Sequence, residues 1–101
     1  MKIAITSEGN TLEAQIDRRF GRCAFFAIYD TDTQTTDFFP NPAKDFPEGA
    51  GPAAVQFVVS KGIKKVVAAE FGAKVKPLFD KLQIEMINES GKPISEIIRK
   101  L

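Results

Sequence analysis

Runs of β-branched and aromatic residues alternate with polar residues in the first part of the chain. The segments KIAITS (Lys2–Ser7), AFFAIYD (Ala24–Asp30) and TTDFF (Thr35–Phe39) predict three strands. Between the second and third strands, the polar residues Thr31–Gln34 predict a tight turn that joins the two strands as a hairpin. We therefore expect the three strands to form an antiparallel meander.

The second half of the chain alternates between helical and strand-like patterns. Apolar residues recur at helical spacing in three segments, which are Pro52–Lys61, Val75–Leu82 and Ile94–Leu101. The intervening segment Lys64–Phe71 is apolar at successive positions, as in a central parallel strand, and Ile84–Asn88 predicts the last strand. The predicted order of elements is therefore βββαβαβα.

This order predicts an α/β fold in a single domain that spans residues 1–101. Right-handed crossovers through the first two helices would place the fourth strand beside the first. With the strands numbered along the chain, the expected sheet order is 3-2-1-4-5. Strand 2 would be antiparallel to the others, and helices would cover the sheet.

A long irregular segment separates the meander from the first helix. The residues Pro40–Pro52 include four prolines and two glycines, which excludes a regular element. Loops of this length within compact domains are often functional. We predict that Asn41–Gly51 is the most mobile internal segment and acts as a lid.

The composition narrows the classes of function. The net charge is +1, from 14 basic and 13 acidic residues, which argues against nucleic acid or an anionic membrane as a general partner. One cysteine cannot form an internal disulfide, and the absence of histidine removes the commonest metal ligand and general base. The short apolar run at the N-terminus does not resemble a signal peptide, and no apolar stretch is long enough for a membrane span. We expect a cytoplasmic protein.

Two acidic features do not indicate an active site. Asp30, Asp32 and Gln34 resemble the start of a calcium-binding loop, but Thr35 and Asn41 stand where that loop needs glycine and glutamate. We interpret this segment as a hairpin turn. Other carboxylates are scattered along the chain and give no metal-dependent nuclease constellation, so we do not expect an enzyme.

A glycine-rich segment precedes the first helix. GAGPAA (Gly49–Ala54) fits the pattern of a dinucleotide-binding turn, but it follows a long loop rather than a strand. Free N–H groups at a helix start can nevertheless hold an anion. Gly72 precedes the next helix in the same way, and both helix starts should lie beside Ser7 at one end of the sheet. The candidate binding residues from this reasoning are Ser7, Gly49, Gly51 and Gly72.

The segment RRFGRC (Arg18–Cys23) concentrates positive charge around the single thiol. Gly21 allows a tight turn, and the arginines could hold an anion and lower the pKa of Cys23. Alternatively, the arginines are solvated and Cys23 packs as a small hydrophobic residue. We predict that Cys23 is partly exposed and more acidic than a free thiol.

Together, these segments resemble the dinitrogenase iron–molybdenum cofactor biosynthesis family, which includes NifX-like carriers and the C-terminal part of NifB-type proteins. The resemblance lies in KIAIT, DRRFGRCAFFAIYD, GAGPAA and GIKKVVAAEFGAKVKPLFDKLQIEM, with F-G-R at Phe20–Arg22 as its most specific part. It implies a ribonuclease H-like fold with three layers. It also implies binding or carriage of an iron–sulfur or iron–molybdenum cluster, or its precursor, rather than catalysis. Many members have histidine where this chain has Arg19, which leaves Cys23 as the only soft ligand nearby.

The resulting hypothesis is a non-catalytic carrier of a metal–sulfur cluster. Cys23 would be the metal ligand, and Arg19 and Arg22 would be counter-charges. The other candidate cofactor-binding residues are Ser7, Phe20, Gly21, Gly49, Gly51 and Gly72. Cluster-assembly or cluster-receiving proteins would be the partners of a monomer or weak homodimer. The alternative is a regulatory module that binds a non-metal anion or a nucleotide at the same helix starts.

Overall fold

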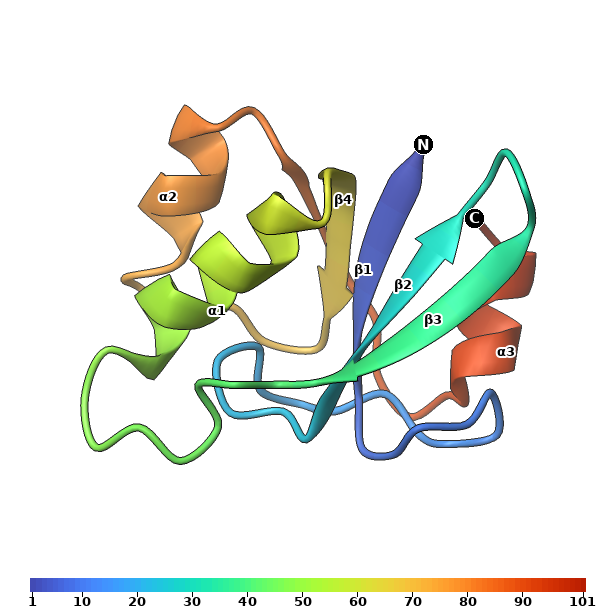
Figure 1. Ribbon diagram of the computed structural model, residues 1–101, viewed down its shortest axis with the longest axis horizontal. Coiled ribbons are helices and arrows are strands. Elements are labelled where there is room, and N and C mark those ends of the chain that lie inside the picture. Colours follow the sequence, from blue (N-terminus) through green and yellow to red (C-terminus); the bar gives the residue numbers. More distant parts are fainter.

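The sheet has five strands in the order β3-β2-β1-β4-β5, in a computed structural model that describes residues 1–101 (Figure 1). The strands are β1 (Lys2–Ser7), β2 (Phe25–Asp30), β3 (Thr35–Pro40), β4 (Ile63–Ala68) and β5 (Glu85–Asn88). β2 pairs antiparallel with β1 and β3, whereas β1, β4 and β5 run parallel. The predicted fold class, strand order and antiparallel second strand are confirmed.

Three helices connect or follow the parallel strands: α1 (Ala50–Ser60), α2 (Lys76–Lys81) and α3 (Ile94–Arg99). The second and third are shorter than their apolar patterns predicted. Leu82 and Leu101 end the predicted segments but lie just beyond the helices, and their side chains are 49% and 41% exposed. No helix combines the length and apolar character needed to cross a bilayer.

Two hydrophobic cores cover opposite faces of the sheet. Because successive side chains of a strand point to opposite faces, Ala4 lies in one core while Ile3 and Ile5 lie in the other. The helices α1 and α2 pack on the first face, and α3 covers the second with Ile94 and Ile97 (Figure 1). The result is the expected three-layer arrangement of helices, sheet and helix.

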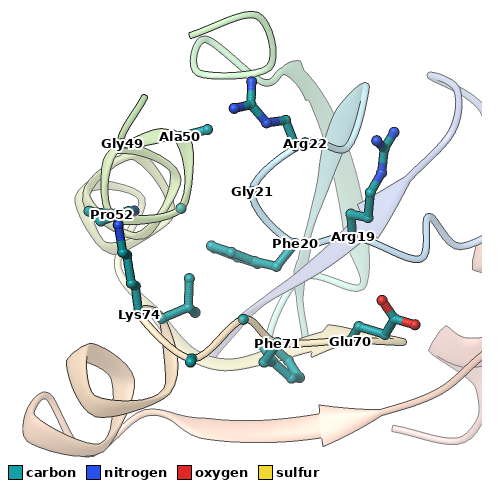
Figure 2. A pocket seen from close by; sticks show the side chains of 14 residues that line it. Arg19, Phe20, Gly21, Arg22, Gly49, Ala50, Pro52, Glu70, Phe71 and Lys74 are labelled. Atoms are coloured by element: carbon teal, nitrogen blue, oxygen red, sulfur yellow. The ribbon is translucent and has the colours of Figure 1, made fainter. Parts of the chain in front are cut away.

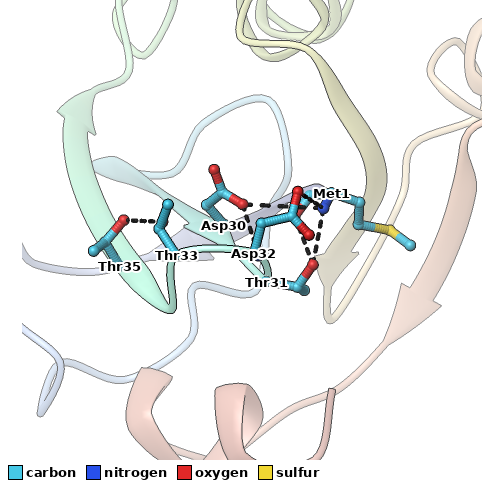
Figure 3. Close-up of polar contacts among 6 residues, drawn as sticks. All are labelled: Met1, Asp30, Thr31, Asp32, Thr33 and Thr35. Carbon is cyan, nitrogen blue, oxygen red and sulfur yellow. Dashed lines mark hydrogen bonds and ion pairs between the residues drawn. The ribbon is translucent and has the colours of Figure 1, made fainter.

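The hairpin between β2 and β3 confirms the interpretation of its acidic residues as a turn. The N-terminal ammonium donates to Thr31 Oγ1 at 2.8 Å and lies 3.3 Å from Asp32 Oδ2 and 4.0 Å from Asp30 Oδ1 (Figure 3). Beside this group, the hydroxyls of Thr33 and Thr35 are 2.7 Å apart. The two carboxylates thus face a cation of the chain itself.

Several connecting segments lie close together at one end of the sheet, where β1 and β4 have their carboxyl ends. Since Ser7 pairs with Phe25, the segment that precedes β2 starts from the same end. The strand predicted to reach Phe71 ends at Ala68, and the N–H of Glu70 instead donates to the carbonyl of Arg18 at 2.9 Å. This bond brings the segments before β2 and after β4 together.

We predict that Ile97→Ala lowers the free energy of unfolding by about 2–5 kcal/mol, because Ile97 is fully buried between the short helix α3 and the sheet. Leu82→Ala is the control, since its side chain is half exposed, and it should cost about 1 kcal/mol or less. Denaturant unfolding followed by circular dichroism measures both. Equal losses would mean that α3 contributes little to the second core.

Candidate functional site

An open cavity of about 420 Å³ lies where three segments meet at this end of the sheet (Figure 2). Its walls are Arg19–Arg22, Gly49–Pro52 and Glu70–Val75. The structure therefore brings together seven of the residues predicted from the sequence, which are Arg19, Phe20, Gly21, Arg22, Gly49, Gly51 and Gly72. The predicted residues Ser7 and Cys23 do not line this cavity.

Close contacts at two glycines join the three walls. A Cβ atom added to Gly21 would lie 3.0 Å from both N and Cα of Gly51, which belongs to the first turn of α1. A Cβ atom on Gly51 would in turn lie 2.9 Å from Cγ2 of Val75. A side chain at either position would have to push the neighbouring wall aside, which favours glycine at both.

Positive charge predominates around the cavity. Arg19, Arg22 and Lys74 line it, and Glu70 is the only acidic residue among the lining residues. The carboxylate of Glu70 is 3.2 Å from Nη2 of Arg18, so an arginine outside the cavity neutralises it. Arg19 and Lys74 form no ion pair within the protein, which leaves their charges available to an anion.

Backbone N–H groups add to this positive character. No N–H of Ala50 or Gly51, at the start of α1, donates to an acceptor within the protein, and the same holds for the residues Gly72–Lys74. The dipole of the eleven-residue helix α1 also favours negative charge at its first turn. The lining residues thus offer hydrogen-bond donors from two separate segments.

Aromatic rings form an apolar floor. Phe20 is 2% exposed, and its ring centroid lies 6.1 Å from that of Phe71 and 5.2 Å from that of Phe79. Figure 2 shows the Phe20 side chain between the wall that contains Ala50 and the wall that contains Phe71. A ligand of this cavity would meet apolar surface below and cationic groups at the rim.

Cys23 lies in the first hydrophobic core rather than at the rim of the strand. Its side chain is fully buried, and Sγ donates to the carbonyl of Phe20 at 3.3 Å. Burial raises the pKa of the Cys23 thiol far above its ordinary range, and the carboxylate of Asp17 raises it further. The prediction of an exposed, acidic thiol was wrong, because the chain turns Cys23 inward and its neighbouring arginines face outward.

Ser7 is also held away from the cavity. Its side chain is fully buried, and its hydroxyl donates to the carbonyl of Gly9 at 2.7 Å. The Ser7 hydroxyl therefore has its hydrogen-bond partner within a local turn at the end of β1 and needs no ligand.

The described residues contain no group of three or more His, Cys, Asp or Glu side chains arranged to hold a metal ion. With the single thiol buried and no histidine in the chain, the cavity offers cations, N–H donors and apolar surface instead of metal ligands. The cavity therefore suits an anion, and any metal ion in that anion would need to have all its ligands already.

The sequence reasoning missed Phe71, Lys74 and Asn41. Phe71 belongs to the predicted strand Lys64–Phe71, whereas Lys74 stands two residues after Gly72, so the predicted helix start could have indicated it. Asn41 lies at the end of β3 and is 6% exposed, and its Nδ2 donates to the carbonyls of Gly21 and Cys23 at 3.0 Å each. Only the fold reveals that role, because twenty residues separate Asn41 from Gly21.

The loop that Asn41 begins is more firmly attached than its proline content suggested. Ala43 is fully buried, and its N–H donates to Oδ1 of Asn41 at 3.0 Å. Phe46 is 43% exposed, so the apolar anchor of this loop is Ala43. The high mobility of Asn41–Gly51 stays a prediction.

One family model and several solved structures are similar to this chain. A family model described as dinitrogenase iron-molybdenum cofactor matches residues 1–101. The apo form of the orange protein from Desulfovibrio gigas is similar in structure, with a TM-score of 0.91 and 26% identity over 98% of this chain and 84% of that chain. A Thermotoga protein that was provisionally described as NifB has a TM-score of 0.85 and 30% identity, over 97% of this chain and 84% of that chain. The search of curated proteins gave no match.

We predict that Gly21→Ala lowers the free energy of unfolding by about 1–3 kcal/mol, because the added methyl group would contact the backbone of α1. Gly72→Ala is a matched control in the same cavity, since nothing lies within 4 Å of its added Cβ. Thermal and denaturant unfolding measure both variants. Equal stability of the two variants would show that the wall can shift without cost.

We predict that Cys23 of the native protein reacts with iodoacetamide at least about 100-fold more slowly than in the unfolded chain at the same pH, because a buried thiol must first be exposed by opening of the structure. Mass spectrometry of quenched samples measures the rate, and the chain in denaturant is the control. Comparable rates in the two states would contradict the buried position.

Proposed function

The chain belongs to the dinitrogenase iron–molybdenum cofactor family, and from this premise we propose that it binds a preassembled, anionic metal–sulfur cluster and carries it unchanged. The cargo would be an iron–molybdenum cluster, an iron–sulfur cluster or a precursor of one.

An excess of positive charge above an apolar floor is the main support for this proposal. Arg19 and Lys74 are exposed cations without ion-pair partners, and Phe20 supplies the buried surface beneath them. The sulfur atoms of a cluster are polarisable and accept hydrogen bonds, so they suit N–H donors and aromatic edges alike. A strongly hydrated anion would gain less from the aromatic floor.

The protein would hold the cargo without coordinating it. Clusters bound through protein ligands usually take about four of them, mostly cysteine thiolates. This chain has one cysteine and no histidine, and Cys23 is kept as a neutral thiol in the core. A cluster that retains its own sulfide or other exogenous ligands is therefore the cargo that fits.

The exposed rim suits a carrier. Gly72, Ala73 and Lys74 form one side of the cavity mouth and are exposed, so cargo can enter and leave without displacing a core element. Nothing among the lining residues suggests that the cargo is altered while bound. Such a carrier would act in the cytoplasm, between proteins that assemble the cluster and proteins that receive it.

A second candidate is binding of a non-metal anion such as phosphate or a nucleotide. The unpaired N–H groups of Ala50 and Gly51 at the start of α1 favour it, because a helix N-terminus accepts phosphate readily. The two candidates differ in whether the ligand must contain sulfur, and binding of sulfur-containing and sulfur-free probes distinguishes them.

We predict that the protein, purified without oxygen, binds added tetrathiomolybdate, or the product of added iron and sulfide. The bound probe should keep the protein coloured through gel filtration. The double variant Arg19→Ala/Lys74→Ala should bind tetrathiomolybdate about tenfold or more weakly, because it removes the two unpaired cations of the rim. The double variant Lys64→Ala/Lys81→Ala removes the same charge outside the cavity and should bind like the wild type. Absorption titration measures each affinity.

Cys23→Ala tests the mode of binding. It should retain wild-type affinity for tetrathiomolybdate, because the thiol lies outside the cavity. Loss of colour in a folded Cys23→Ala protein would instead establish coordination by the thiol. Tight binding of phosphate or AMP with no retention of either coloured probe would favour the second candidate.

A further inference from the structure

Reciprocal hydrogen bonds join two segments near the cavity, the segment Gly21–Cys23 and the loop Asn41–Glu48. From the segment before β2, Arg22 Nη1 donates to the carbonyl of Lys44 at 2.9 Å and to that of Phe46 at 2.5 Å. Figure 2 shows the Arg22 side chain extending away from Phe20. Its guanidinium is therefore already engaged with backbone oxygens.

Asn41 makes the reciprocal connection from the other segment. Its Nδ2 donates to the carbonyls of Gly21 and Cys23, which flank Arg22. Asn41 is also fixed in place, because its own N–H donates to the carbonyl of Ala24 at 3.0 Å. The two side chains thus fasten the loop Asn41–Glu48 to the segment Gly21–Cys23 at its beginning and in its middle.

The attachment of the loop affects the cavity because of the residues that follow the loop. The loop leads directly into Gly49–Pro52, which is one of the three walls. Gly21 contacts the same wall at Gly51, so a displaced loop would alter both the spacing of the walls and the position of the N–H groups at the start of α1.

From these contacts we infer that Arg22 is a positioning residue for the cargo site, acting through the loop Asn41–Glu48 and the first turn of α1, while Arg19 and Lys74 supply the charge that faces the cargo. This role revises the expectation that Arg22 is a counter-charge, and it rests on the proposed function as far as cargo is concerned. The attachment of the loop is a property of the protein alone.

Hydrogen exchange in the free protein tests the attachment. The N–H groups of Lys44 and Phe46 donate to the carbonyls of Asn41 and Ala43 at 3.3 and 3.1 Å, so their exchange reports opening of the loop. Arg22→Ala should accelerate exchange at these two amides about tenfold or more, because it removes two charge-assisted hydrogen bonds. Arg19→Ala should leave them unchanged. Equal exchange in the wild type and Arg22→Ala would overturn the inference.

Titration with tetrathiomolybdate at low and high salt tests the consequence for binding. Salt screens a counter-charge, so the loss of affinity in Arg19→Ala should shrink as salt rises. The loss in Arg22→Ala should be about tenfold at both salt concentrations, because a misplaced wall is not screened. Arg22→Lys keeps the charge but lacks the planar fork, and it should not restore affinity. Full rescue by lysine, or a loss that disappears at high salt, would assign Arg22 to charge instead.

The two measurements separate failure of the inference from failure of the proposed function. If the wild type binds no tetrathiomolybdate and no iron–sulfide product, the proposed cargo is wrong, and hydrogen exchange alone decides whether Arg22 positions the loop. If the wild type binds the probe but Arg22→Ala binds equally well, the loop is fastened without consequence for the site and the inference is wrong.

Discussion

The contact between Gly21 and Gly51 determines whether the cavity exists in its present form. At this point two backbone segments approach so closely that a methyl group on Gly21 would lie 3.0 Å from main-chain atoms of Gly51. The approach brings the turn before β2 against the first turn of α1, and the contact of Gly51 with Val75 extends it to the segment before α2. Three pieces of chain far apart in the sequence are thereby held at fixed spacing around one hollow.

Much of the architecture was predictable because the strands have strong local patterns. β-branched and aromatic runs mark β1, β2 and β3, and the handedness of crossovers then orders the whole sheet. The ends of elements were less predictable. Phe71 has the apolar character of a strand residue, yet it belongs to a connecting segment. The chain leaves β4 after Ala68, and Glu70 forms an isolated bridge with Arg19, which is distant in the sequence. Tertiary contacts of this kind leave no periodic signal.

The cavity was predictable as a meeting of glycine-led segments and arginines, but its chemistry was not. The direction of Cys23 depends on how the turn at Gly21 enters β2, and one residue of difference would reverse it. Its burial with Asn41 and Phe20 could be established only from the fold. Asn41 gave no sequence signal for its role either, since its partners belong to a segment that approaches it only after the sheet has formed.

Charge at the site is local rather than global. The chain carries a net charge of +1, yet the cavity is lined by three cations against one carboxylate, and that carboxylate is paired with Arg18. Long-range attraction of acidic macromolecules would therefore be weak, while an anion that reaches the cavity meets a concentrated field.

Burial of the only thiol in the core also prevents several reactions of an exposed cysteine. A surface thiolate would exchange with disulfides, become oxidised, or bind copper and zinc ions. With Cys23 protonated and fully buried, the native surface presents no thiol. Under the proposed function, the cargo would therefore be selected by shape and charge, without covalent capture by a thiol.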